Sequence, residues 1–147
     1  MLSCRNINNT EGRIKFTRPL FSTTETGELL LTYPDGGKQI LSSEGIDYNP
    51  HISPDNKYIA LDLIKFSNLQ ITRLFKRGSS NTFIEEKNLS SAAWKEFSKN
   101  NDLRIEQIIN PRSRVINLND TTVKIELSGI SEENEDILGI IELNLEN

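Results

Sequence analysis

The chain has 147 residues, a hydrophobic content of 35% and a net charge of -4 at pH 7. This length suits one domain, residues 1–147, with residues 1–12 as a flexible N-terminal segment. The single cysteine excludes an internal disulfide. The single histidine excludes metal sites built from several histidines and most catalytic dyads. No apolar run approaches the ~18 residues of a membrane-spanning helix. We therefore expect no membrane span, no metal site and no cofactor.

The small net charge conceals an uneven distribution along the chain. Residues 1–118 carry 16 basic and 13 acidic side chains, whereas residues 119–147 carry one basic and eight acidic side chains. An acidic segment of this kind is commonly a solvated loop, but it can also steer an electropositive partner to the surface. The candidate partner-binding residues are Glu132, Glu133, Glu135, Asp136 and Glu142.

Residues 28–43 carry the strongest local signal in the sequence. Two apolar runs flank the residues PDGG at 34–37. The Asp-Gly pair supplies the positive φ angles that a tight turn between two strands needs. The segment therefore predicts a β-hairpin in which Tyr33 pairs with Lys38.

A second hairpin is predicted from residues 57–66 and 69–77, with a two-residue turn at 67–68. That register places Asp62 opposite Arg73 within a mostly apolar face. The two side chains therefore form a predicted structural ion pair. A longer turn would shift the register by one residue and separate them.

One helix is predicted near residues 89–100, after a short strand at 82–86. Asn88 or Ser90 is suited to cap its first turn. Apolar side chains then recur at helical spacing, at Leu89, Ala93, Trp94 and Phe97.

Residues 103–109 are compatible with a strand or a short helix, and Pro111 is expected to end either element. Further strands follow at 114–118, 122–127 and 137–145. The sequence thus predicts a mainly β to α+β fold of about eight strands in antiparallel meanders, with the helix packed on the sheet.

Residues 34–77 resemble one repeat of the TolB-type (PD40) β-propeller family. The matching features are the PDGG turn, the strand KQILSS, the linker end NPHI, the signature SPDNKYIA at 53–60 and the hairpin after it. In that family an SPDG-like turn launches an inner strand of a blade. Asn56 replaces the usual glycine and tolerates the same left-handed backbone. A propeller needs at least ~4 blades of ~40 residues, so the resemblance implies a local β-meander and not a closed propeller.

Cys4 follows Leu2 and Ser3, an order also found at the processing site of bacterial lipoproteins, where the cysteine is lipidated. The hydrophobic segment that should precede such a cysteine is absent from the sequence. Cys4 is therefore either a free thiol or, if a leader precedes it in the gene, a lipid attachment site. The first alternative predicts a cytoplasmic protein, and the second a periplasmic or membrane-anchored one.

His51 and Ser53 share one face of an extended segment and could form a base and nucleophile pair. No glycine-flanked elbow accompanies them. Ser53 and Asp55 are better interpreted as stabilising a turn.

Residues 65–114 hold ten basic and five aromatic side chains, but the aromatic residues fit a core better than a nucleic-acid surface. No nucleic-acid partner is expected.

Three functions remain, and we expect the first. A small acidic protein without a catalytic set suits a non-catalytic binding module, most specifically an immunity protein that neutralises a bacterial toxin with a basic domain. The first alternative is a cell-envelope lipoprotein or periplasmic accessory protein, suggested by Cys4 and the TolB-like segment. The second alternative is a hydrolase that uses His51.

Overall fold

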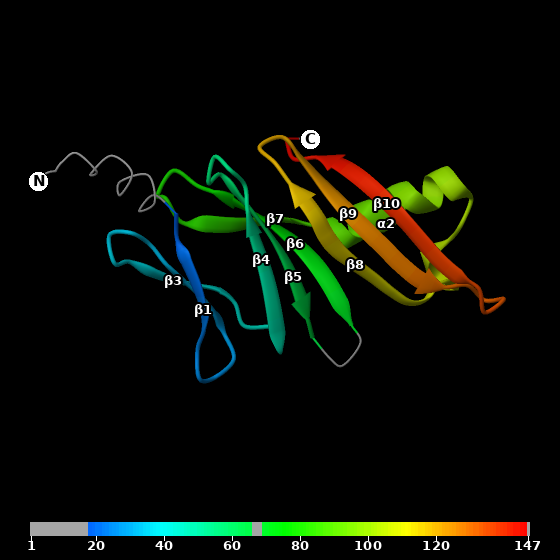
Figure 1. Ribbon diagram of the computed structural model, residues 1–147, viewed down its shortest axis with the longest axis horizontal. Coiled ribbons are helices and arrows are strands. Elements are labelled where there is room, and N and C mark those ends of the chain that lie inside the picture. The colour runs from blue at the N-terminus through cyan, green and yellow to red at the C-terminus, as the bar shows by residue number, and fades with distance from the viewer. Residues whose placement is uncertain (1–17, 66–68, 147) are drawn as a thin grey trace, which may run out of the picture. The chain divides into compact units, whose positions relative to one another are not determined.

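The computed structural model describes residues 18–65 and 69–146 (Figure 1). The chain divides into two compact units, residues 1–43 and residues 44–147. The organisation as a single domain stays a prediction. The N-terminal segment 1–12, with Cys4, lies outside the described residues.

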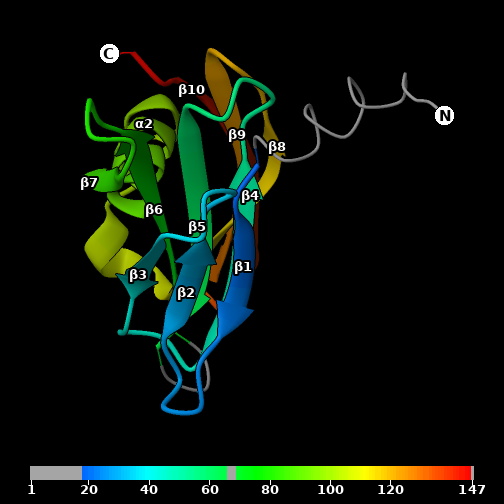
Figure 2. The ribbon, with the colours of Figure 1, turned by 90° about the vertical axis from the view of Figure 1, so that its left-hand side faces the viewer.

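The first unit contains a three-stranded antiparallel sheet in the order β1-β2-β3 (Figure 2). Its strands are β1 (Leu20–Thr23), β2 (Leu29–Thr32) and β3 (Lys38–Ser42).

The hairpin predicted at residues 28–43 is confirmed as β2 and β3, and the N–H of Gly36, at φ 94°, donates to the C=O of Tyr33. The predicted register is wrong by one residue beside the turn, because Lys38 pairs with Thr32 rather than with Tyr33. The N–H of Tyr33 instead donates to the C=O of Gly37 inside a longer loop.

The second unit contains two antiparallel sheets and the one long helix (Figure 1). The four-stranded sheet has the order β4-β5-β6-β7, with β4 (Asp47–Ile52), β5 (Tyr58–Ile64), β6 (Gln70–Arg77) and β7 (Phe83–Asn88). The three-stranded sheet has the order β10-β9-β8, with β8 (Ile109–Leu118), β9 (Thr122–Ile130) and β10 (Asp136–Asn144). The helical segments are α2 (Leu89–Asn101) and the 3-10 turn η1 (Ile105–Gln107).

The mainly β fold with one helix is confirmed, and the described residues form no closed barrel or propeller. They contain ten strands where about eight were expected. The additional strands are β1 and β4. Pro50 lies in β4, an edge strand, where a residue without an N–H donor is tolerated.

Helix α2 packs against β6 and β10, and β8 packs against β5 and β6. Asn88 caps the helix by accepting a hydrogen bond from the N–H of Ser91, as one of the two predicted caps. The rings of Trp94 and Phe97 meet edge to face, with centroids 5.7 Å apart. The helix thus joins a core drawn from both sheets, which includes Tyr58, Ala60, Leu74, Val115, Val123, Ile125, Leu127 and Ile141.

The predicted ion pair between Asp62 and Arg73 is not formed. Asp62 lies opposite Thr72, whereas Arg73 lies opposite Leu61. Arg73 instead pairs with Glu44 and Glu85, each at 2.9 Å. The cause is the length of the turn between β5 and β6. The N–H of Lys65 donates to the C=O of Leu69, so the turn is longer than the predicted two residues. A one-residue shift turns a side chain to the opposite face of a strand. The predicted turn residues 67–68 lie outside the described residues.

Pro111 does not end an element, contrary to the sequence-based prediction. The ambiguous segment 103–109 forms η1, and then strand β8 begins at Ile109 and runs through Pro111. The register between β8 and β9 shifts between Ile109 and Arg112. A bulge accommodates proline because it leaves a position that makes no ladder hydrogen bond.

Candidate protein-binding edge

The turn between β9 and β10 holds the predicted acidic residues at the tip of a hairpin. The N–H of Ser131 donates to the C=O of Glu135 at 2.8 Å, and the N–H of Asn134 donates to the C=O of Ser131 at 2.9 Å. Asn134 adopts φ 65°, a left-handed conformation that asparagine tolerates. Glu132, Glu133 and Glu135 are all exposed. With Asp136, they form what we call the acidic tip.

The fifth predicted residue, Glu142, lies apart from the acidic tip. Asp136 begins β10 opposite Ile130, and Glu142 lies six residues later, opposite Lys124. At ~3.4 Å per residue, the two positions are about 20 Å apart. The structure therefore brings four of the five predicted carboxylates together and leaves Glu142 on the face of the strand.

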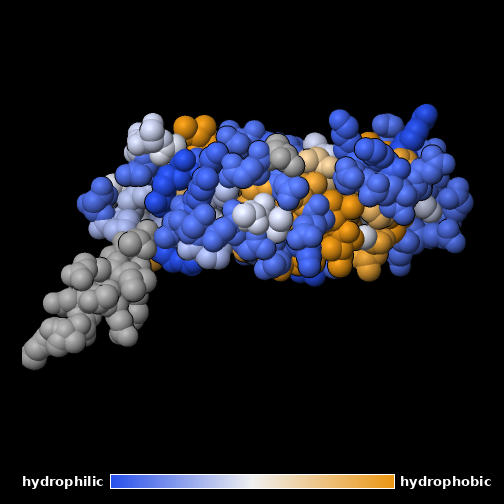
Figure 3. All heavy atoms as spheres, turned by 90° about the horizontal axis from the view of Figure 1, so that it is seen from above, coloured by the Kyte–Doolittle hydropathy of each residue, from blue (hydrophilic) through white to orange (hydrophobic). Residues whose placement is uncertain are grey.

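Two large apolar side chains on β10 are exposed beside the acidic tip. Leu138 is 70% exposed and Ile140 is 58% exposed, whereas Ile141 is buried in the core. Apolar side chains that reach the surface appear as orange areas among hydrophilic blue ones in Figure 3. The exposed pair was not singled out from the sequence. The alternation in DILGIIELN could have identified it, because residues i and i+2 share a face.

A buried carboxylate, Asp62, organises a second polar cluster within the second unit. Asp62 is 4% exposed and accepts hydrogen bonds from the Thr72 hydroxyl at 2.7 Å and from the Val115 N–H at 3.0 Å. The Nε2 atom of His51 lies 3.4 Å from its Oδ2 atom. Asp62 therefore ties β5 to β6 and β8 and brings the single histidine next to an acid.

Further hydroxyl groups extend this cluster to the start of α2. The hydroxyls of Thr72 and Ser113 lie 2.8 Å apart, and those of Ser113 and Ser90 lie 2.6 Å apart. A pocket of about 90 Å³ lies beside Asp62 and is lined in part by Arg114 and Val115. The hydrogen bonds of the cluster join β5, β6, β8 and the start of α2.

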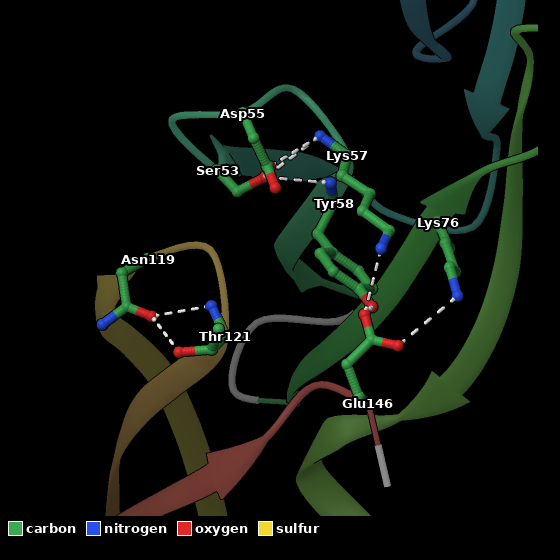
Figure 4. Close-up of polar contacts among 8 residues, drawn as sticks. All are labelled: Ser53, Asp55, Lys57, Tyr58, Lys76, Asn119, Thr121 and Glu146. Carbon is green, nitrogen blue, oxygen red and sulfur yellow. Dashed lines mark hydrogen bonds and ion pairs between the residues drawn. The ribbon is translucent and has the colours of Figure 1, made fainter.

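The hydroxyl of Ser53 is engaged in the turn before β5 (Figure 4). It donates to Asp55 at 2.6 Å and accepts from the N–H of Tyr58 at 3.0 Å. Burial favours a higher pKa for Asp55, but the hydrogen bonds from Ser53 and the Lys57 N–H outweigh it and lower the pKa. Ser53 and Asp55 thus stabilise this turn, and His51 has Asp62 as its acidic neighbour.

Tyr58 and Glu146 form a contact that sequence reasoning missed (Figure 4). The Tyr58 hydroxyl donates a hydrogen bond to the Glu146 carboxylate, which also lies 3.3 Å from Nζ of Lys57 and 3.8 Å from Nζ of Lys76. Burial and then the contact with Glu146 raise the pKa of Tyr58. The hydrogen bond from Tyr58, followed by that from Lys57, lowers the pKa of Glu146. No local pattern could predict a pairing 88 residues apart in the chain.

No family model, curated protein or solved structure matches this chain. The TolB-like resemblance of residues 34–77 therefore stays a prediction. Within residues 18–65 and 69–146, no helix is long and apolar enough to cross a membrane. In the same part of the chain, no group of three or more histidine, cysteine or acidic side chains is placed to hold a metal ion.

Proposed function

We propose that this protein acts by binding a basic protein through the acidic tip, and that it serves as an immunity protein that neutralises a bacterial toxin. The observation that carries the proposal is the concentration of Glu132, Glu133, Glu135 and Asp136 around one exposed turn. A cluster of one sign raises the local concentration of an oppositely charged partner and accelerates its association.

No basic residue adjoins the acidic tip along the chain or forms an ion pair with it in the described residues. Residues 130–139 contain no lysine or arginine. None of the ion pairs among the described residues involves the acidic tip. Its carboxylates are therefore available to a partner, in contrast to Glu126 and Glu146, which are paired with Arg114 and Lys57 within the protein.

Binding is favoured over the hydrolase alternative by the surroundings of His51. The nearest candidate nucleophile, the Ser53 hydroxyl, is engaged by Asp55 and by the N–H groups of Lys57 and Tyr58. The lipoprotein alternative depends on Cys4, which lies outside the described residues. It would change where the protein acts without changing the binding surface.

The test is association with the basic protein encoded beside the gene, measured at low salt. One variant carries E132K, E133K and E135K. A matched variant with the same charge change carries E25K, E86K and E106K at other exposed positions. We expect the first variant to associate at least about tenfold more slowly and the second to stay within about threefold of the parent protein.

Equal slowing in both variants would show that net charge matters and the acidic tip does not. If the product of the neighbouring gene neither binds this protein nor is toxic without it, the immunity role is wrong.

A further inference from the structure

Strand β10 is the outermost strand of its sheet (Figure 1). Its nine residues pair with β9 in an unbroken register from Asp136 to Asn144, without a bulge. The strand contains no proline. Bulges, prolines and charged side chains, above all lysines, are the usual devices that keep a sheet edge from pairing with another chain. Strand β10 has no bulge, proline or lysine, and its charged side chains are the acidic Asp136 and Glu142.

The alternation of hydrogen bonds between β9 and β10 shows which backbone groups of β10 face away from β9. The N–H of Ser131 donates to Glu135, and the N–H of Leu145 donates to Thr121, at the two ends of the hairpin. In each of these pairs, the residue on the β10 side of the hairpin, Glu135 or Leu145, has an odd number. Because hydrogen-bonded pairs alternate along an antiparallel ladder, the N–H and C=O groups of the even-numbered residues point to the free edge.

The same even-numbered residues carry the exposed side chains of the strand. In order, they are Asp136, Leu138, Ile140 and Glu142, all of which are exposed. The opposite face packs inward, since an added Cβ at Gly139 would lie 2.3 Å from Phe97 of α2. The free edge therefore presents the backbone N–H and C=O groups of these four residues. Their exposed side chains follow one another in the order acidic, apolar, apolar, acidic.

We propose that residues 136–142 are a β-strand addition site for an extended, antiparallel segment of the basic partner. The segment has the pattern basic-x-apolar-x-apolar-x-basic, so that its basic side chains lie opposite Glu142 and Asp136 and its apolar ones opposite Ile140 and Leu138. The basic character of the partner rests on the proposed function. Main-chain hydrogen bonds supply affinity in this mode of recognition, and alternate side chains supply specificity.

Charge favours this occupant over a second copy of the chain. A two-fold antiparallel pairing of two β10 strands centred on Gly139 would match Leu138 with Ile140 of the other copy, but it would also place Asp136 opposite Glu142. It would also align two copies of a segment in which residues 119–147 carry eight acidic side chains and one basic side chain. Like charges brought together across a pair of strands are destabilising.

The experiment uses the full chain and the peptide acetyl-Lys-Thr-Val-Thr-Val-Thr-Lys-amide. In the proposed register, the N–H groups of the two valines point to β10, whereas those of the threonines point away. N-methylation of both valines should weaken binding at least about tenfold. N-methylation of the last two threonines should change it by less than about threefold. Equal losses for the two modified peptides, or no binding of the unmodified one, would overturn strand addition.

Two protein variants provide an independent check. Ile140→Pro removes an outward N–H without removing a bond to β9, and Ile140→Thr is the matched control that keeps the N–H. We expect the proline variant to lose peptide binding and the threonine variant to retain more of it. Amide exchange of the β9 residues checks that the sheet is intact. A dimer of the unbound chain that Ile140→Pro dissociates would instead identify a second copy as the occupant and overturn the proposal.

The two proposals fail in different ways. If strand addition is wrong but charge-driven binding is right, the acidic-tip variant still slows association with the neighbouring gene product, and Ile140→Pro leaves that association unchanged. If the proposed function is wrong, that association is absent, whatever the peptides do.

Discussion

The hydroxyl of Tyr58 donates a hydrogen bond to the carboxylate of Glu146, the last residue that the structure describes. The Tyr58 residue is fully buried at the start of β5. The ammonium groups of Lys57 and Lys76 lie 5.7 Å and 5.8 Å from its ring centroid, within the range of a cation–π contact. These contacts thus hold the C-terminal residues against the four-stranded sheet of the second unit.

Tyr58→Phe removes the hydroxyl and keeps the buried ring. We expect the melting temperature to fall by about 2–4 °C, because one hydrogen bond is lost without a cavity. Circular dichroism on heating measures this change. The control is Tyr58→Phe combined with Glu146→Ala, which should melt close to Glu146→Ala alone. Fully additive shifts would contradict a direct contact between the two side chains.

The lowered pKa of Glu146 predicts a loss of stability in acid. The hydrogen bond from Tyr58, and then that from Lys57, lowers this pKa below its ordinary value of 4.5. The stabilisation is therefore complete above about pH 4.5 and is lost as the pH falls through the folded-state pKa. We expect the melting temperature of the parent protein to fall more steeply below this pH than that of Glu146→Gln. Parallel curves would contradict the assignment.

Asp62→Ala should be among the most destabilising substitutions in the second unit. It leaves the buried N–H of Val115 and the hydroxyl of Thr72 without their acceptor, at a cost of about 2–4 kcal/mol in the free energy of unfolding. Asp62→Asn should cost less, since an amide oxygen can still accept a hydrogen bond. Urea unfolding at constant m value measures both. Equal losses for Ala and Asn would contradict the hydrogen-bonding role.

Asp62 and Arg73 should behave independently, because their side chains lie on opposite faces of the hairpin. In a cycle of Asp62→Asn and Arg73→Gln, the changes in unfolding free energy should add to within about 0.5 kcal/mol. A coupling well above that value would support the register with a two-residue turn and contradict the structure.

Gly139→Ala should destabilise the contact between β10 and α2. The added Cβ would lie 2.3 Å from an edge carbon of Phe97, and overpacking of this kind costs about 1–3 kcal/mol. Phe97→Leu makes room for the methyl group, so the alanine substitution should cost less in that background. Thermal unfolding of the four proteins measures the coupling. An equal cost in both backgrounds would show that the clash is not with Phe97.

Local chemistry in the sequence predicts much of the secondary structure. The hairpin at 28–43 follows from a turn that needs positive φ, and helix α2 follows from its cap and its apolar spacing. The acidic tip follows from a run of charges that cannot be buried. Each of these signals lies within a few neighbouring residues, so no tertiary information was needed.

Only the tertiary structure decides the partners of these elements. The length of the turn after Lys65 sets the strand register. In that register, Asp62 accepts hydrogen bonds from Thr72 and Val115 and does not pair with Arg73. The order of strands makes β10 an edge, and thereby exposes Leu138 and Ile140. Strand pairing and packing join residues far apart in the chain, and a shift of one residue reverses the face of every side chain. The sequence by itself therefore determined the elements and the charge of this protein, whereas the arrangement of the elements determined which surface can meet a partner.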